Sequence, residues 1–357
     1  MDDQFPTFEG SVCPLPLKNE TTIVLGHGSG GLMTHNLIQE VFQAHFQNSF
    51  IKAGNDFANT PIPENYQNGK LSISTDGHII SPIFYPGGDI GRLAICGTVN
   101  DISMSGSNPL YITASFILEE GLQIADLNKI VLSMQETAEE AGVEIVAGDT
   151  KVVEKGKGDG IFISTTGIGW LPDHIQIRGD LARPGDVILI SGTIGDHGIA
   201  VLSARGDLGF ETDLQSDVAP LNHLIQSLIT EIPEIHVLRD PTRGGLATTL
   251  NEIARQSNVG LMVYDELIPI NSTVQSACEM LGFDPLYVAN EGKVVVILSK
   301  EYKQRALEIM KSNVYGKNAA FIGEVVANHS GHVVLKTSFG TTRMLEMMAG
   351  EMLPRIC

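Results

Sequence analysis

Four aspartates in the first half of the chain have the surroundings of a cation site. They are Asp56 (GNDFA), Asp76 (STDG), Asp101 (VNDIS) and Asp149 (AGDTK), each predicted to lie in a polar turn just after an apolar segment. A single aspartate of this kind is usually only a turn or capping residue, but four at the ends of successive elements would meet at one rim of a sheet. Because clustered carboxylates repel one another, the arrangement favours Mg²⁺ held together with substrate phosphates.

A lysine and a glycine-rich loop add groups that suit phosphate. Lys151 follows Asp149 by two residues and supplies a positive charge for phosphate oxygens. The loop GHGSGG contains Gly28, Gly30 and Gly31 between a predicted strand and a predicted helix. The loop matches G-x-G-x-x-G, the pattern of dinucleotide-binding loops, but the acidic residue expected about 20 positions later does not lie at the end of a clear strand. The sequence also contains no P-loop pattern. Phosphate binding by backbone N–H groups and a purely structural turn are both compatible with this loop.

The chain ends in LPRIC, so that Cys357 is its last residue. Chain ends are usually loosely ordered, and an incidental residue is the simplest interpretation. The other cysteines, at positions 13, 96 and 278, form no C-x-x-C pair, and neither a zinc site nor a disulfide framework is predicted. Cys96 and Cys278 stand in apolar stretches that predict burial, so Cys357 is the thiol expected to be reachable.

The composition indicates an acidic, folded protein. A chain of 357 residues exceeds the roughly 250–300 residues of a single core, so two domains are predicted. Its 42 acidic residues exceed its 23 Lys and Arg by 19, and this charge disfavours nucleic acid and anionic membranes as partners. The start lacks the features of a signal peptide and no apolar run of about 18 residues occurs, which predicts a cytoplasmic protein without a membrane span.

Strand-like and helix-like segments alternate along the chain, which indicates an α/β fold. We predict an arm over 1–20, a first domain over 21–172, a second domain over 173–340 and a mobile tail over 341–357. Strands are expected at TTIVL, before Asp76, before Asp149 and at DVILISG, and helices after GHGSGG, over GRLAICGTV and after RDPTRGG. FIGEVV and HVVLKT predict a β-hairpin. Gly350 and Pro354 place the chain end outside any sheet.

The motifs STDG, VNDISMSG, FILEEG, AGDTKVV, SGTIGDHG, RDPTRGG, ANEGK, IGEV and PRIC, in that order, resemble one known family. It is the family of hydrogenase maturation factors HypE, the carbamoyl dehydratases, in the superfamily of aminoimidazole ribonucleotide synthetase, formylglycinamidine synthetase and selenophosphate synthetase. The resemblance covers about residues 20–357, and PRIC is its most specific part. It implies a two-domain PurM-like α/β fold, a homodimer joined by its N-terminal halves through a β-barrel, and ATP with Mg²⁺ near that interface.

The resemblance also implies a function for the terminal cysteine. In the family, a HypF-type carbamoyltransferase loads this cysteine with a carbamoyl group, and ATP-driven dehydration converts the thiocarboxamide into a thiocyanate. The cyano group then passes to iron on a HypC/HypD-type maturation scaffold and becomes a ligand of [NiFe] hydrogenase.

The residue types suit that chemistry. An amide oxygen must be phosphorylated before it can leave, and Asp56, Asp76, Asp101, Asp149 and Lys151 suit a Mg-nucleotide that does so. Glu291 in ANEGK is the predicted general base for the amide protons, because burial between two strands would raise its pKa; a solvated turn glutamate is the alternative. His197 in GDHG is a weaker candidate for proton transfer. Asp240 and Arg243 of RDPTRGG are weaker candidates for a second anion-binding loop.

Two other functions remain open at this point. A small-molecule kinase resembling selenophosphate synthetase predicts a reactive cysteine in the first glycine loop, and GHGSGG contains none. A nucleotide-gated carrier would present Cys357 without splitting ATP, and the sequence does not separate it from an enzyme.

Overall fold

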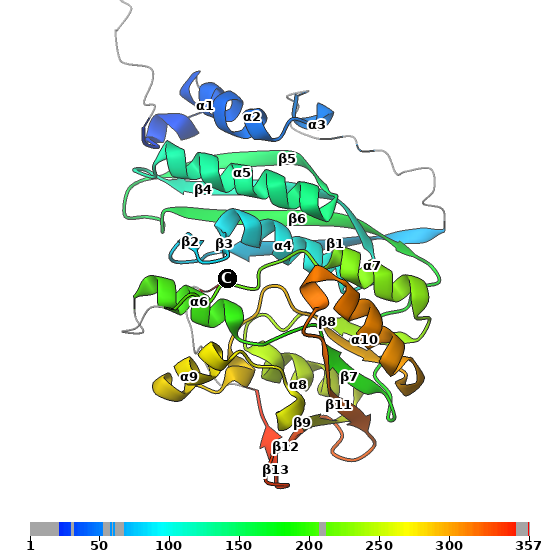
Figure 1. Ribbon diagram of the computed structural model, residues 1–357. Helices are drawn as coiled ribbons and strands as arrows, with labels where there is room; N and C mark the ends of the chain where they lie inside the picture. Colours follow the sequence, from blue (N-terminus) through cyan, green and yellow to red (C-terminus); the bar gives the residue numbers. More distant parts are fainter. Residues whose placement is uncertain are drawn as a thin grey trace, which may run out of the picture.

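The computed structural model describes residues 21–29, 32–52, 58, 60, 68–206, 212–347 and 356. Two main sheets follow one another along the chain, one within residues 69–172 and the other within residues 187–345, with helices around and between them (Figure 1). Among the described residues, no helix is both long and apolar enough to cross a membrane. The cytoplasmic location stays a prediction.

The first sheet has four strands in the order β1-β6-β4-β5. Their bounds are β1 (Gly69–His78), β4 (Asn108–Glu119), β5 (Glu144–Val153) and β6 (Ile161–Pro172). Strands β4 and β5 are parallel and are connected by α5 (Ile124–Ala141), whereas β6 pairs antiparallel with β1 and β4. A small ladder of β2 (Phe84–Tyr85) and β3 (Gly88–Asp89) leads into α4 (Ile90–Ser103).

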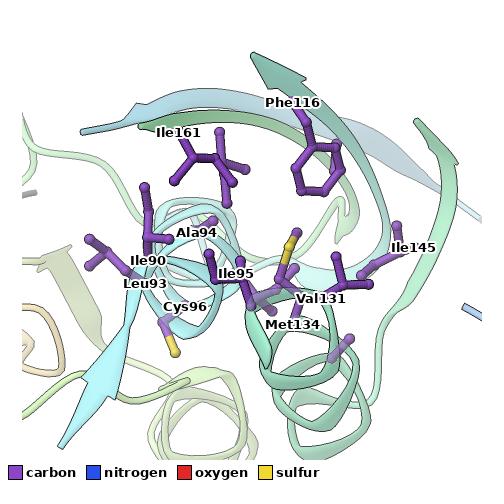
Figure 2. Packing of buried hydrophobic residues seen from close by; sticks show 14 of the residues in the cluster. Ile90, Leu93, Ala94, Ile95, Cys96, Phe116, Val131, Met134, Ile145 and Ile161 are labelled. Carbon is purple, nitrogen blue, oxygen red and sulfur yellow. The ribbon is translucent and has the colours of Figure 1, made fainter. Parts of the chain in front are cut away.

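Helices α4 and α5 cover one face of this sheet, and the apolar core lies between the two helices and the sheet (Figure 2). Side chains of a strand alternate between its two faces, and Ile112, Ala114, Phe116 and Leu118 of β4 are accordingly all buried on the helix side. Asp89 caps α4 by accepting hydrogen bonds from the N–H groups of the first turn, at 2.6 and 3.1 Å. The cap and the apolar faces together determine where α4 begins and which side it buries.

The N-terminal helical segment lies beyond the β5 edge of this sheet (Figure 1). It contains η1 (Leu25–Gly28), α1 (Leu32–Leu37), the π-helical η2 (Ile38–Phe42), α2 (Gln43–His45) and α3 (Ser49–Lys52). The helix predicted after the glycine loop is therefore confirmed over residues 32–45. The strand predicted at TTIVL is wrong, because that stretch makes only an isolated bridge from Thr22 to Gln123 before η1 begins.

The second sheet has seven strands in the order β13-β12-β9-β11-β7-β10-β8. The strands are β7 (Val187–Ile190), β8 (Ile235–Arg239), β9 (Gly260–Tyr264), β10 (Val295–Leu298), β11 (Ala320–Val326), β12 (Val333–Lys336) and β13 (Thr342–Leu345). The helices are α6 (Asp196–Arg205), α7 (Asn222–Glu231), α8 (Gly245–Ser257), α9 (Ser272–Leu281) and α10 (Lys303–Ser312). Short 3₁₀ turns are η3 (Asp265–Leu267), η4 (Pro285–Tyr287), η5 (Lys300–Tyr302) and η6 (Val314–Gly316).

Both faces of the second sheet are buried, and β7 shows how. Ile188 and Ile190 belong to the apolar cluster that contains α8, whereas Val187 and Leu189 belong to the cluster that contains α7 and α10. A four-residue apolar run thus supplies two cores, because its side chains alternate between the faces.

Two predictions at the end of the second half are wrong. FIGEVV lies in β11 and HVVLKT in β12, but they form no hairpin, because β9 lies between them and pairs parallel with β12. Residues 342–345 were expected in a tail outside any sheet, and they form β13 on β12 instead. In both cases, long-range pairing provides hydrogen bonds that local turn signals do not reveal.

The predicted carboxylate turns are also wrong for the three aspartates that the structure describes. Asp76 lies within β1, Asp149 lies within β5, and Asp101 lies in the last turns of α4. Both strands continue beyond their aspartate because β6 and β4 extend the ladders there. The aspartate inside each strand, half-buried at Asp76 and exposed at Asp149, therefore does not end the strand.

Candidate active site

A buried polar cluster lies where the loops of the second half meet the first sheet. Its centre is the segment Asn290–Lys293, between η4 and β10. Asp217 accepts a hydrogen bond from the Glu291 N–H through Oδ1, at 3.0 Å, and its Oδ2 lies 2.9 Å from Lys293 Nζ. A Cβ at Gly292 would lie 1.8 Å from the carbonyl oxygen of Asp217, so only glycine permits this approach.

Glu291 is the least satisfied carboxylate of this cluster. Its side chain is 5% exposed, and Oε1 has no hydrogen-bond partner among the described residues. Burial, followed by the negative charges of Asp217, Asp240 and Asp76, raises the pKa of Glu291 well above its ordinary value. The burial predicted from the sequence is therefore found, and it increases the affinity of the Glu291 carboxylate for a proton.

Asp217 and Lys293 set the charge around Glu291. Burial alone would raise the pKa of Asp217, but the charge of Lys293, together with the hydrogen bonds from the Glu291 N–H and from Lys293, outweighs burial and lowers that pKa. The aspartate is therefore an anion in the protein interior, and its charge acts on Glu291. Neither residue was predicted from the sequence, although Lys293 stands in the same ANEGK motif as Glu291.

His197 lies in the first turn of α6 and is fully buried. Its Nδ1 lies 2.7 Å from Ser216 Oγ, and its Nε2 lies 2.6 Å from the carbonyl oxygen of Ile356. Its ring meets the ring of Tyr85 edge-on, with centroids 5.5 Å apart. Burial lowers the pKa of His197, partly opposed by Asp217 and the bond to Ile356, so the ring is held neutral. Both ring nitrogens are thus engaged.

Helix α4 joins this cluster to the first sheet. Asn100 donates to the carbonyls of Ala219 and Glu291 at 3.0 and 3.4 Å and accepts from the N–H of Leu221 at 2.8 Å. Its neighbour Asp101 accepts a hydrogen bond from Ser74 Oγ at 2.7 Å. The VNDIS motif therefore supplies both a structural bridge between the two halves and a carboxylate facing the domain junction.

Three further acidic residues belong to the electrostatic surroundings of Glu291, since Asp76 and Asp240 act on Glu291 and Asp101 acts on Asp240. Burial, together with nearby Asp76, raises the pKa of Asp101, although the hydrogen bond from Ser74 opposes the shift. Burial and Asp101 raise the pKa of Asp240 to about 7. Asp101 and Asp240 also line a cavity of about 540 Å³ whose wall includes Arg243. The weaker candidates from RDPTRGG therefore lie beside two of the predicted carboxylates.

A separate cavity of about 370 Å³ lies between the N-terminal helices and strands β4 and β5. Gly28, Asp149 and Lys151, which the sequence analysis linked to phosphate, all line it. Its apolar wall includes four phenylalanines beside aliphatic residues, and they are Phe42, Phe46, Phe50 and Phe116. An apolar slot with a few charged groups at its rim is typical of a small-molecule site.

The structure thus brings the predicted residues together in two groups. Asp76 and Asp101 lie near Glu291, whereas Asp149 and Lys151 lie on β5, three strands from β1 and roughly 14 Å away. Asp56, Gly30, Gly31 and Cys357 lie outside the described residues. Within the described part of the chain, no group of three or more His, Cys, Asp or Glu is arranged to hold a metal ion. The expected rim of four carboxylates is therefore not found for the three that are described.

The chain matches two models of the AIR synthase related proteins, which define its class. The N-terminal domain model covers residues 58–171 and the C-terminal domain model covers residues 183–336. The carbamoyl dehydratase HypE of Azotobacter vinelandii is 51% identical over 343 residues, which is 96% of this chain and 99% of that protein.

Two solved structures are similar along most of their length. One is hydrogenase maturation protein HypE in complex with ATP, with a TM-score of 0.89 and 49% identity over 94% of this chain and 99% of that one. The other is a HypE–HypF complex, with a TM-score of 0.76 and 54% identity over 87% of this chain and 99% of that one. The chain belongs to the HypE family of carbamoyl dehydratases.

Proposed function

We propose that this protein is an ATP-dependent dehydratase that acts on its own S-carbamoylated Cys357. The carbamoyl oxygen forms a bond to the γ-phosphorus of ATP as the bond to ADP breaks. The C–O bond then breaks, phosphate leaves with the oxygen, and loss of both N–H protons leaves the thiocyanate. The products are S-cyanocysteine, ADP and phosphate, and the cyano group is the precursor of a hydrogenase iron ligand.

The observation that carries this proposal is the state of Glu291. A buried carboxylate without a hydrogen-bond partner on one oxygen is costly unless it serves a ligand. A primary amide offers two N–H donors and suits that oxygen. The raised pKa makes the carboxylate a strong enough base to accept an amide proton as phosphate leaves. His197, the second candidate for proton transfer, already uses both ring nitrogens.

The aromatic cavity beside β5 is our candidate for the ATP site. Its phenylalanines suit a nucleobase, and Lys151 and the Gly28 loop suit phosphate oxygens. Lys151 Nζ and Asp149 form an ion pair at 2.9 Å, and both side chains are largely exposed. Because this pair is solvated, an incoming phosphate can take the lysine at little cost.

Magnesium remains part of the proposal, although the described carboxylates form no complete cage. Mg²⁺ commonly uses only one or two protein carboxylates together with phosphates and water. Asp149 beside the aromatic cavity and the Asp76–Asp101 pair are carboxylates of that kind. When bound, the ion would supply positive charge for phosphoryl transfer.

We further propose that the protein is a homodimer through the outer face of the first sheet. The residues of β1 that point away from α4 include Leu71 and Ile73, which are 53% and 67% exposed, and Ile117 of β4 is exposed on the same face. Ile73 pairs with Ile168, which pairs in turn with Tyr111, so an apolar row crosses three strands. A second copy would bury this row.

The substitution Ile73→Asp should then yield monomers in analytical sedimentation. An unchanged mass of the assembly would exclude this face as the dimer interface.

The proposed partners follow from the chemistry at Cys357. The similarity to the chain of the HypE–HypF complex supports a HypF-type carbamoyltransferase as the loading partner. A HypC/HypD-type scaffold that carries iron is proposed as the acceptor of the cyano group. Both would need to reach the same terminal residue at different times.

The decisive experiment follows intact mass during incubation with the carbamoyltransferase, carbamoyl phosphate and ATP. The protein should first gain the mass of one HNCO and then lose that of one water, whereas Cys357→Ala should do neither and keep its fold. A gain without the later loss would make the protein a carrier. Labelling that persists in Cys357→Ala would place the acceptor on another cysteine.

A further inference from the structure

Ile356, the residue next to the terminal cysteine, is built into the junction between the two halves. Its side chain is 4% exposed and belongs to the large apolar cluster of the first half. Its backbone forms an antiparallel bridge with Ile80, which precedes β2. The second-half members of the same cluster include Val201, one helical turn after His197 on α6. A residue near the chain end thus has the burial of a core residue.

The hydrogen bonds of His197 require one particular tautomer. The carbonyl oxygen of Ile356 can only accept, so Nε2 carries the hydrogen and donates it. Nδ1 of the neutral ring is then an acceptor and takes the hydroxyl hydrogen of Ser216. Ser216 Oγ remains free to accept from the N–H of Val218 at 3.1 Å. Every donor and acceptor is matched without a charge on the ring.

The same loop holds His197 and Glu291. Ser216 bonds to His197, and the next residue, Asp217, accepts the N–H of Glu291. The backbone N–H of Ser216 donates to the carbonyl of Pro86 at 2.8 Å, which ties this loop to the turn between β2 and β3. The position of the Ile356 carbonyl is therefore coupled to that of the Glu291 backbone through two consecutive residues.

We propose that His197 and the apolar site around Ile80, Tyr85 and Val201 form an anchor for the penultimate residue. The anchor holds Ile356 by its side chain and carbonyl and so presents Cys357, bonded directly to it, to Glu291. His197 is then a positioning residue and not the base. This inference rests on the proposed function, because it says which residues set the position of Cys357 relative to the proposed dehydration site.

The anchor is tested by the reactivity of the Cys357 thiol. The measurement is the rate of maleimide addition in a Cys13→Ser background, without ATP or partner, read by intact mass; the remaining Cys96 and Cys278 are buried. His197→Phe keeps a ring but removes the donor and should raise the rate about three- to tenfold. Ile356→Ala removes most of the buried side chain and should raise it about tenfold or more, with Ile356→Val in between.

A matched pair of amides separates the two nitrogens of His197. Glutamine can place an N–H near the position of Nε2, so His197→Gln should return the labelling rate towards that of the wild type. Asparagine reaches only the position of Nδ1, so His197→Asn should behave like His197→Phe. Labelling within about twofold of wild type for both His197→Phe and Ile356→Ala would overturn the anchor. A folded His197→Gln that labels as fast as His197→Phe would overturn the role of the hydrogen bond.

Dehydration of the loaded protein gives an independent readout. Labelling follows the undocked fraction of the tail, whereas dehydration follows the docked fraction. Variants of the anchor should therefore show a labelling rate that is several-fold higher and a dehydration rate that is only slightly lower than in the wild type. Slower dehydration with unchanged labelling would indicate damage to the site and contradict the anchor. If the loaded wild type never loses water, the proposed function fails, but the labelling test still decides the anchor.

Discussion

Two ion pairs of this protein have the same chemistry and opposite surroundings. Lys293 and Asp217 lie 2.9 Å apart with side chains only 9% and 3% exposed. Lys151 and Asp149 also lie 2.9 Å apart, but their side chains are 65% and 61% exposed. The first pair stands beside Glu291 at the domain junction, and the second lines the aromatic cavity beside β5.

The difference shows which pair can exchange partners. An exposed pair contributes little to stability, because water and salt screen its charges, so its lysine is available to a phosphate. A buried pair cannot lose one member without leaving a charge in a medium that solvates it poorly. We therefore assign the exposed pair to ligand binding and the buried pair to maintaining the electrostatic environment of Glu291.

The largest expected effect is on chemistry beside the buried pair. Glu291→Gln keeps the shape of the side chain but cannot accept a proton, so the dehydration rate should fall by about 10²–10⁴-fold while carbamoyl loading continues. Single-turnover mass spectrometry of the loaded protein measures this rate, with the exposed Glu154→Gln as a control. A fall below about threefold, or an equal loss of ATP affinity, would remove Glu291 from the base role.

The next effect is on stability and contrasts the two lysines directly. Lys293→Met leaves Asp217 buried without its cation and should cost about 3–5 kcal/mol of unfolding free energy. Lys151→Met should cost less than about 1 kcal/mol, since its partner stays in water. Denaturant unfolding measures both, and adding Asp217→Asn to Lys293→Met should recover part of the loss. Similar costs for the two single variants would refute the assignment of different roles.

A smaller effect is expected on ligand binding at the exposed pair. If Lys151 contacts a phosphate, Lys151→Met should weaken ATP binding by about ten- to a hundredfold, as loss of a charge-assisted hydrogen bond does. Calorimetric titration measures the affinity, and Lys155→Met on the neighbouring surface is the control. An unchanged affinity in Lys151→Met would place the nucleotide elsewhere.

The smallest effect is a pH dependence of stability. The folded protein holds the Glu291 proton more tightly than the unfolded chain does, so stability falls as pH rises from the ordinary glutamate pKa of about 4.3 towards the raised folded pKa. Glu291→Gln removes this penalty and should raise the melting temperature more at about pH 8 than at about pH 4, by a few degrees. An equal shift at both pH values would show that the carboxyl group is not buried with a raised pKa.

Many helices and strands of the fold could be predicted, because local sequence patterns determine them. The helix opened by RDPTRGG and the strand DVILISG are found as α8 and β7, since apolar spacing and a glycine start are local signals. The separation of β11 from β12 could not be predicted, because β9, which lies between them, comes from about 60 residues earlier in the chain. Strand order depends on contacts between distant segments, which turn residues do not encode.

The candidate site divides in the same way. By itself, the sequence determined the residue types for the proposed chemistry and the family resemblance that links Cys357 to it, and it predicted that Glu291 is buried, with a solvated turn as the alternative. Only the tertiary structure decided that Asp217 and Lys293 surround Glu291, that His197 holds Ile356, and that Asp149 stands apart from Asp101. The reason is physical: a residue type is a local property, whereas burial beside a particular charge depends on which distant segments fold against each other.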